Sequence, residues 1–452
     1  MSTVAAISTA QGQGGIGVIR ISGKNSFEIT DKIFKSVSGK KVADIKGYTA
    51  LFGHIFRDNE KIDEVVVLKF VAPKSFTGEN VVEISCHGGM YITREVLKCV
   101  IDAGATLAQP GEFTKRAYLN GKMDLTEAES VMDIINSKNN FALQSSMSQL
   151  QGSLQEEIKN LREKIIYEIA FIESALDDPE NYDTEGYGEK LYSVVKDIKN
   201  QIHDLILKSD NGKMLKEGIK TVILGKPNAG KSSFLNRLVG EEKAIVTNIA
   251  GTTRDTLEET IRLNGISLQL IDTAGIRETE DIVEKIGVDK SKEEALNADL
   301  IILVLNNNEK ISQEDLELLN INSNVNKIVF INKCDLDKKI DESKLEGNII
   351  VRGNTIDTYG LDELKNKIKE MFNLNKINTG DYNYLSNARQ IALVKNALES
   401  IENAMTSAEN EVPLEMIAQD ISDAYSTLGE IIGSTYKDEL LDELFSKFCL
   451  GK

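Results

Sequence analysis

The sequence of 452 residues contains no tryptophan, only five prolines and only four cysteines. No two cysteines form a CxxC pair, which argues against a disulfide framework and against a zinc cluster. No segment approaches the roughly 20 consecutive apolar residues of a membrane span. Residues 1–17 lack the basic-then-apolar order of a signal peptide. We therefore expect reduced thiols, no membrane contact and a cytoplasmic location.

Basic residues are scarce relative to acidic ones: 53 Lys and Arg stand against 71 Asp and Glu, a formal net charge of −18. Nucleic-acid-binding proteins usually show the opposite balance, because neutralised phosphates supply most non-specific affinity. Any RNA contact must therefore be local or shared with a partner protein. The length and the 41% hydrophobic content are sufficient for about two to four domains with their own cores.

The strongest motif is Gly225-Lys226-Pro227-Asn228-Ala229-Gly230-Lys231-Ser232-Ser233, between an apolar run at 219–224 and a helical pattern from 233. The order of strand, glycine loop and helix is that of a P-loop. Gly225 and Gly230 let the backbone surround phosphates, and Lys231 can reach the β- and γ-oxygens. The Ser232 hydroxyl can bind Mg²⁺. The alternative is a glycine turn with a chance Lys-Ser pair.

Further motifs follow in the order that a GTPase requires. In the polar loop Gly251-Thr252-Thr253-Arg254-Asp255, Thr253 can bind Mg²⁺ and sense the γ-phosphate. In Ile271-Asp272-Thr273-Ala274-Gly275, Asp272 can hold Mg²⁺ through water and the Gly275 amide can contact the γ-phosphate. In Asn332-Lys333-Cys334-Asp335, the Asp335 carboxylate can accept guanine N1–H and N2–H₂. A site built on such bonds discriminates against adenine, so we expect GTP.

Two positions depart from the pattern of Ras-like GTPases. The fifth loop usually reads Ser-Ala-Lys, and the nearest match here is Asn354-Thr355-Ile356, so base contacts from that loop are left open. Ile276 stands where Ras-like proteins carry the glutamine that orients the attacking water. Another residue must do this, and Arg254 and Arg277 are candidates for a cationic finger.

The first 118 residues show an α+β pattern, with strands expected at 18–21, 65–71 and 81–84 and a helix at 91–103. Residues 12–17 spell GxGxxG, but no helical pattern follows. We interpret this segment as a glycine loop between strands and not as a dinucleotide site. Cys86-His87-Gly88-Gly89 could indicate a metal or nucleophile site, but a turn at a strand end is the favoured interpretation.

Two helical tracts flank the nucleotide-binding segment. The first has a long helix with an apolar stripe from Leu150 to Ile172, then an acidic loop at 177–185, a helix at 191–207 and a polar linker at 208–218. The acidic loop could bind a metal, but a solvated connector is the favoured interpretation. The second is expected to be helical from 387, with an apolar stripe from Ile391 to Met405, and again over 417–448. Neither stripe can be buried alone, so we expect a helical domain in two halves around an inserted α/β domain. The predicted boundaries are 1–118, 119–214, 215–376 and 377–452.

The whole chain resembles the MnmE (TrmE) family of tRNA modification GTPases, which carry a hydrophobic residue where Ile276 stands. The ending Phe448-Cys449-Leu450-Gly451-Lys452 is close to the family's Phe-Cys-Ile-Gly-Lys. The resemblance implies an N-terminal folate-binding α+β domain, a discontinuous helical domain and an inserted Ras-like P-loop G domain. It also implies that Glu284 positions water. The implied GTP-contacting loop is Thr247, Asn248, Ile249, Ala250, Gly251, Thr252 and Thr253.

The resemblance implies a potassium-activated G domain. Asn228, Thr247, Ile249 and Thr252 match the family's potassium ligands, and a monovalent cation near the phosphates can replace an arginine finger's charge. It also implies a site for a tetrahydrofolate derivative, a 5-formyl or a methylene form. Arg20, Glu83, Lys122 and Lys452 fall on folate-contacting positions, where a pterin suits a carboxylate and a glutamate tail suits Lys or Arg. Cys449 is a candidate functional thiol, but a semi-buried helix-end cysteine is the favoured interpretation.

The implied function is GTP hydrolysis coupled to tRNA modification. A homodimer, together with an FAD-dependent partner of the MnmG type, would add an aminomethyl or carboxymethylaminomethyl group to C5 of the wobble uridine. Two alternatives stay open. One is a ribosome-assembly switch of the Era or EngA kind, and the other is a regulatory scaffold that uses GTP-driven dimerisation.

Overall fold

The computed structural model describes residues 2–10, 12–137, 139–182, 184–241, 259–263, 266–271, 295–322, 325–372, 384–385, 387–410, 412–434 and 438–451. The chain forms two compact units. The first joins Met1–Asn136, Ser146–Ile202 and Ala392–Lys452, and the second joins Ser137–Ser145 and His203–Ile391. The second unit thus interrupts the first, as the inserted arrangement requires. Within the described ranges, no helix has the length and apolar character to cross a membrane.

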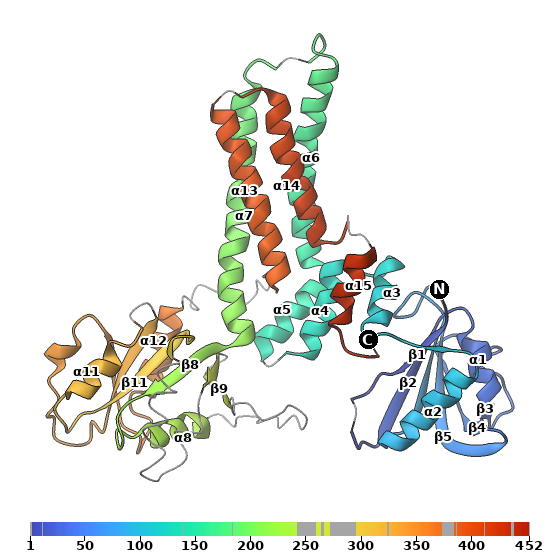
Figure 1. Ribbon diagram of the computed structural model, residues 1–452, viewed down its shortest axis with the longest axis horizontal. Coiled ribbons are helices and arrows are strands. Elements are labelled where there is room, and N and C mark those ends of the chain that lie inside the picture. Colours follow the sequence, from blue (N-terminus) through green and yellow to red (C-terminus); the bar gives the residue numbers. More distant parts are fainter. Residues whose placement is uncertain are drawn as a thin grey trace. The chain divides into compact units, whose positions relative to one another are not determined.

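The first unit begins with a seven-stranded sheet in the order β3-β4-β5-β6-β2-β1-β7, in which only β1 and β7 pair in parallel. Its strands are β1 (Val4–Ile7), β2 (Ile16–Ser22), β3 (Phe34–Ser36), β4 (Thr49–Arg57), β5 (Glu60–Phe70), β6 (Val81–His87) and β7 (Thr106–Leu107). Helices α1 (Ser26–Ile33) and α2 (Met90–Asp102) lie beside the sheet (Figure 1). The three expected strands and the expected helix are therefore confirmed.

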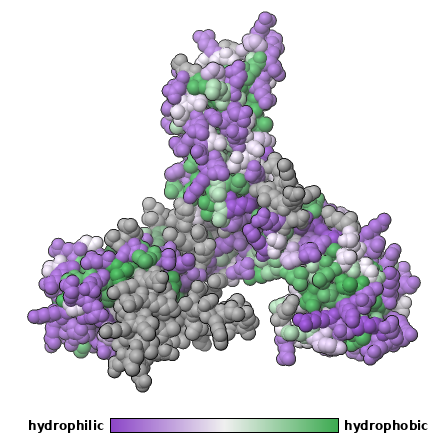
Figure 2. Space-filling view, viewed as in Figure 1, coloured by the Kyte–Doolittle hydropathy of each residue, from purple (hydrophilic) through white to green (hydrophobic). Residues whose placement is uncertain are grey.

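The two faces of this sheet have different surroundings. Ile19, Ile21 and Val67 belong to the core that includes Val96 and Val100 of α2. Because successive side chains alternate between faces, the neighbours of these residues lie on the other face. There Ile16, Phe52 and Val66 are exposed, and Phe52 lies directly opposite Val66 in the β4–β5 register. Figure 2 shows hydrophobic side chains at the surface of this domain.

The helical part of the chain consists of long helices and shorter ones. They are α3 (Glu112–Leu119), α4 (Leu125–Ile135), α5 (Asn140–Leu150), α6 (Ser153–Asp177), α7 (Tyr187–Glu217), α13 (Ala388–Glu409), α14 (Leu414–Ile431) and α15 (Asp438–Ser446). Helices α6, α7, α13 and α14 run alongside one another (Figure 1). The Arg162 guanidinium of α6 lies 4.1 Å from the Tyr425 ring centroid of α14, and Lys199 of α7 pairs with Glu402 of α13 at 2.9 Å. The two halves of the helical domain therefore pack together.

Three details of the predicted helices were wrong. Gly152 has a φ of +85° and separates α5 from α6, so Leu150 does not belong to the long helix. The polar segment at 208–217 is helical, because α7 continues to Glu217 and ends before Gly218, whose φ is +91°. The helix predicted over 417–448 is interrupted near Gly433, whose φ of +83° a residue with a Cβ rarely adopts.

The second unit contains a six-stranded sheet in the order β13-β12-β11-β8-β10-β9, parallel except for the edge strand β9. Its strands are β8 (Ile219–Leu224), β9 (Glu259–Leu263), β10 (Ile266–Leu270), β11 (Leu300–Asn306), β12 (Asn326–Asn332) and β13 (Ile349–Arg352). The flanking helices are α8 (Lys231–Glu241), α11 (Gln313–Leu319) and α12 (Leu361–Met371), with a 3₁₀ turn at Glu342–Leu345. Every residue of β11 is buried, as expected for a parallel sheet covered on both faces.

Candidate functional site

The P-loop connects the end of β8 to the start of α8, and its backbone geometry requires small residues. Gly225 has a φ of +151°, and a Cβ there would lie 2.5 Å from the Val304 carbonyl oxygen. Gly230 has a φ of +95°, and a Cβ there would lie 2.2 Å from Asn332 Nδ2. Asn228 also has a positive φ, of 62°. Both glycines therefore allow the loop to approach neighbouring strands, and α8 begins at Lys231 with its amide end toward the loop.

Side chains from the end of β12 hold the P-loop. Asn332 is buried, and its Nδ2 donates a 3.0 Å hydrogen bond to the Ala229 carbonyl. Lys333 Nζ donates a 3.0 Å hydrogen bond to the Asn228 carbonyl. Lys231 Nζ donates to the Gly225 and Lys226 carbonyls at 2.7 and 2.9 Å. The predicted base-recognition motif and the predicted phosphate loop thus form one connected structure.

The surfaces beside this structure suit a nucleotide. Asp335 is exposed, as are Ser232 and Ser233 in the first turn of α8. Asn354, at the start of the fifth loop, is buried, and its Oδ1 accepts hydrogen bonds from the Ile356 and Asp357 amides at 3.1 and 2.9 Å. The Asn354 side chain therefore closes its own loop as an Asx turn.

Several predicted site residues fall in segments that lie outside the described residues. They are Thr247, Asn248, Ile249, Ala250, Gly251, Thr252, Thr253, Asp272, Thr273, Ala274, Gly275, Glu284 and Lys452. The assignments of these residues to Mg²⁺, K⁺, water, GTP and folate stay predictions.

Arg20 and Glu83, predicted to contact folate, lie directly opposite each other on β2 and β6. Arg20 Nε donates to Glu83 Oε1 at 2.9 Å, and the Arg20 guanidinium lies 5.2 and 5.6 Å from the ring centroids of Phe76 and Phe113. Arg20 Nη1 is buried and has no hydrogen-bond partner among the described residues. Lys122 is exposed, and its Cγ would lie 3.2 Å from a Cβ at Gly78. The segment 76–78 therefore lies beside the side chains of both Arg20 and Lys122.

The C-terminal tail returns to the N-terminal sheet of the same chain. Ser8 Oγ donates a 3.0 Å hydrogen bond to the Gly451 carbonyl, and the Gly111 amide donates to the Cys449 carbonyl at 3.3 Å. A Cβ at Gly451 would lie 2.3 Å from the Ile7 carbonyl oxygen. Ile7 follows Ala6, the residue that pairs with Arg20 in the register of β1 and β2. Gly451 therefore lies close to the strand pair that carries Arg20.

Comparisons with known proteins agree over the whole chain. Residues 125–449 match the family model of the MnmE helical domain, and residues 3–122 match that of the GTP-binding protein TrmE N-terminus. The tRNA modification GTPase MnmE of Lachnoclostridium phytofermentans is 47% identical over 454 residues, which cover 100% of this chain and 99% of the relative. The chain belongs to the MnmE family of tRNA modification GTPases. This membership confirms the fold class of an N-terminal domain, a helical domain and a G domain.

Other relatives agree with the MnmE assignment. The tRNA modification GTPase MnmE of Bacillus licheniformis is 46% identical over 459 residues and 100% of both chains. Among solved structures, the G domain of the T. maritima FeoB iron transporter is 32% identical and covers 34% of this chain and 97% of that chain, at a TM-score of 0.25.

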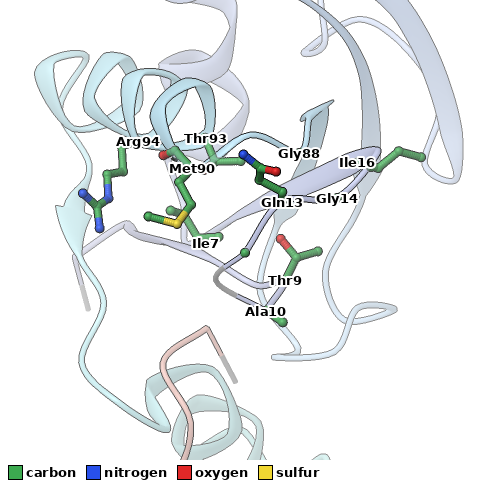
Figure 3. Close-up of a pocket in the computed structure, with 11 residues that line it drawn as sticks. Ile7, Thr9, Ala10, Gln13, Gly14, Ile16, Gly88, Met90, Thr93 and Arg94 are labelled. Atoms are coloured by element: carbon green, nitrogen blue, oxygen red, sulfur yellow. Dashed lines mark hydrogen bonds between the residues drawn. The ribbon is translucent and has the colours of Figure 1, made fainter. Parts of the chain in front are cut away.

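A cavity of about 270 Å³ lies beside the glycine loop of this MnmE family member (Figure 3). Figure 3 shows Met90, Thr93 and Arg94 of α2 lining the cavity, with the Gln13 side chain extending toward Thr93, and Thr9 and Ala10 farther from α2. Residues 12–15 lie between β1 and β2, so the interpretation as a glycine loop between strands is confirmed. None of the predicted folate residues Arg20, Glu83 and Lys122 lines this cavity.

The segment Cys86-His87-Gly88-Gly89 ends β6, as expected for a strand-end turn. Burial, together with the nearby Asp63 charge, raises the pKa of the Cys86 thiol to about 11, so this thiol is a poor nucleophile. His87 Nδ1 lies 2.6 Å from Asp63 Oδ1. Among the described residues, no group of three or more His, Cys, Asp or Glu side chains could hold a metal ion. Cys449, by contrast, is exposed.

Two groups of ion pairs were not predicted from the sequence. Arg116 of α3 is buried and pairs with Glu79 at 3.0 Å and with Glu112 at 2.7 Å. Lys226 of the P-loop pairs with Asp315 of α11 at 2.8 Å. The only sequence signals were the i, i+4 spacing of Glu112 and Arg116 and the Ser-x-x-Asp capping pattern that ends at Asp315.

Proposed function

We propose that the P-loop and the motif Asn332-Lys333-Cys334-Asp335 bind GTP, with Mg²⁺ held by Ser232 and Thr253. The observation that carries this proposal is the hydrogen bond from Asn332 Nδ2 to the Ala229 carbonyl, which joins the guanine-recognition motif to the phosphate loop. The backbone suits a triphosphate, because Gly225 and Gly230 adopt positive φ values and let the loop curve closely against β11 and the end of β12. Lys231 Nζ lies on the loop carbonyls, from which it can reach the β- and γ-oxygens.

Guanine selectivity would come from Asp335, whose carboxylate accepts two guanine donors. Asp335→Asn is expected to weaken GTP binding and to improve binding of xanthosine triphosphate, since the amide offers a donor where xanthine has an acceptor. Asp337→Asn, at another exposed position of the same loop, is the matched control. Equal affinity of the parent protein for ATP and GTP, measured by competition with a fluorescent GDP analogue, would contradict the assignment.

For hydrolysis we assign water positioning to Glu284, because Ile276 cannot accept a hydrogen bond from water. Asn228, Thr247, Ile249 and Thr252 would supply oxygen ligands to K⁺, whose charge stabilises the negative charge of the phosphates. Glu284→Ala is expected to lower kcat while leaving GTP affinity nearly unchanged. Unchanged turnover would return the role to an arginine, Arg254 or Arg277, or to the backbone.

The N-terminal domain would hold a tetrahydrofolate derivative, in the 5-formyl or methylene form, through Arg20, Glu83, Lys122 and Lys452. Bound there, the folate would supply a one-carbon group. The residues fit such a ligand, because Arg20 Nη1 is a buried donor with no partner within the described part of the chain. The aromatic rings of Phe76 and Phe113 beside Arg20 offer apolar contact for a flat pterin.

The tRNA reaction would be addition of an aminomethyl or carboxymethylaminomethyl group to C5 of the wobble uridine, in the cytoplasm. This proposal rests on the relatives, whose names describe tRNA modification GTPases. A net charge of −18 disfavours an extended RNA-binding face on this chain. An FAD-dependent partner of the MnmG type would therefore supply much of the RNA contact as well as the redox chemistry.

The N-terminal domain would also form the homodimer. Phe52 of β4 and Val66 of β5 are exposed and lie directly opposite each other. Val66 also pairs with Ser85 of β6, and Ser85 pairs with Val18 of β2, so the four residues form one row across the sheet. A sheet face that carries exposed apolar side chains favours a protein contact. The alternative of a ribosome-assembly switch of the Era or EngA kind is less favoured, because the similarity to tRNA modification GTPases extends through the N-terminal domain.

A further inference from the structure

Lys226, the second residue of the P-loop, makes an ion pair that its motif does not require. Its Nζ lies 2.8 Å from Asp315 Oδ2 and 3.9 Å from Glu309 Oε2. The Lys226 side chain is one-fifth exposed, whereas the Asp315 side chain is only 5% exposed. Burying an unpaired carboxylate costs free energy, and breaking a buried ion pair leaves such a charge behind. The pair of Lys226 and Asp315 therefore holds the loop against α11.

Asp315 is itself held in one position by the start of α11. Its Oδ2 accepts hydrogen bonds from the Ser312 amide and the Ser312 hydroxyl, both at 2.9 Å, and the Asp315 amide donates to Ser312 Oγ at 3.3 Å. This reciprocal capping box fixes the carboxylate that Lys226 contacts. A cavity of about 10 Å³, roughly the space of one water, is bordered by Asp315, Lys226 and Ala229.

The backbone of Lys226 connects this link to the phosphate-binding groups. The Lys226 carbonyl accepts hydrogen bonds from Lys231 Nζ at 2.9 Å and from the Ala229 amide at 3.3 Å. One residue therefore contacts α11 through its side chain and Lys231 through its carbonyl. Asn332 and Lys333 hold the carbonyls of Ala229 and Asn228 further along the loop. The Lys226 side chain therefore connects the start of the loop to α11, whereas Asn332 and Lys333 connect its later part to the end of β12.

We propose that Lys226 is a positioning residue for nucleotide binding: its ion pair with Asp315 anchors the start of the P-loop on α11 and so prepares the loop for phosphates. The proposal rests on the nucleotide site proposed above. Preorganisation lowers the entropic cost of ordering the loop when the ligand binds. GDP and GTP use the same loop before any bond breaks, so loss of the anchor removes ground-state and transition-state binding alike.

The test compares nucleotide affinity with turnover. Lys226→Met is expected to raise the Kd for GDP and the KM for GTP by about tenfold, the size of one hydrogen bond to a charged group, and to leave kcat within about twofold. Lys226→Arg, which keeps the charge and the donors, should restore most of the affinity. Lys310→Met is the control, because Lys310 borders the same cavity and is exposed. It should leave the Kd for GDP unchanged.

Lys226→Met leaves the Asp315 charge buried, so stability must be separated from positioning. In the double variant Lys226→Met/Asp315→Asn the thermal midpoint should recover, while the Kd for GDP stays as high as in Lys226→Met. Parental affinity in the single variant, or affinity that recovers together with the thermal midpoint in the double variant, would overturn the proposal. A parent protein that binds no GDP would instead refute the proposed nucleotide site.

Discussion

Asn332 donates a 3.0 Å hydrogen bond from Nδ2 to the carbonyl of Ala229, 103 residues earlier in the chain. Asn332 ends β12 and Ala229 lies just after β8, so the contact crosses the carboxyl ends of two parallel strands with β11 between them. Ligands of open parallel sheets bind at these ends. The contact therefore connects the motif proposed to recognise the base with the loop proposed to bind the phosphates.

Gly230→Ala tests this contact. A Cβ at Gly230 would lie 2.2 Å from Asn332 Nδ2, so the loop or the asparagine must move. We expect the Kd for GDP to rise by at least about tenfold, measured with a fluorescent GDP analogue. Gly347→Ala is the matched control: Gly347 has a similar φ of +83°, and a Cβ there would have no atom within 4 Å. Equal affinities of the two variants would contradict the importance of this close approach.

Potassium dependence tests the cation assignment. The Asn228 side chain has no hydrogen bond to the described residues, so its amide oxygen is free to bind an ion. GTP turnover should be higher in K⁺ than in Na⁺ at matched ionic strength. Asn228→Gly, which removes the amide but tolerates the φ of +62°, should abolish that difference. If the parent protein turns over equally in both ions, Asn228 is not a potassium ligand.

Removal of the tail tests the folate site. Deleting Leu450, Gly451 and Lys452 should weaken binding of a reduced folate, measured by calorimetry, and should leave GTP hydrolysis unchanged because the nucleotide site lies in the other unit. Ser8→Ala separates loss of the tail's attachment from loss of the Lys452 side chain. This variant removes the hydrogen bond to the Gly451 carbonyl and retains Lys452. Undiminished folate binding by the truncated protein would remove Lys452 from the site.

Thiol reactivity tests the description of the cysteines. Burial raises the pKa of Cys86 to about 11 and also raises the pKa values of Cys99 and Cys334, whereas Cys449 is exposed. A raised thiol pKa means less thiolate below it, and at pH 8 a group with a pKa near 11 is about one-thousandth ionised. One fast-reacting thiol is expected in the folded protein, and Cys449→Ser should remove it. Fast labelling of Cys86 would contradict its burial.

The sequence predicted elements with local signals and missed those that depend on distant contacts. Strand alternation located β2 and β6, but nothing local indicates that Arg20 lies opposite Glu83, 63 residues later. The polar segment after position 207 suggested a linker. It is helical, and buried Ser209 accepts a 2.9 Å hydrogen bond from the Leu385 amide, a contact that periodicity cannot reveal.

The P-loop shows the same distinction within one site. Lys231, Asn332 and Asp335 were predicted because their spacing belongs to a known motif. The pair of Lys226 and Asp315 was missed because it depends on β8 and β11 being neighbours, which places the loop after one strand near the helix that follows the other. The predicted domain boundaries stay predictions, since α7 runs from one compact unit into the other.

GTP hydrolysis by this chain is proposed to drive wobble-uridine modification, and mass spectrometry of tRNA nucleosides tests this function most directly. Cells that lack the gene should lose the C5 substituent of the wobble uridine. The parent gene should restore the substituent, and a Lys231→Ala gene, expressed at the same level, should not. A full complement of C5-modified wobble uridine in cells without the gene would contradict the account.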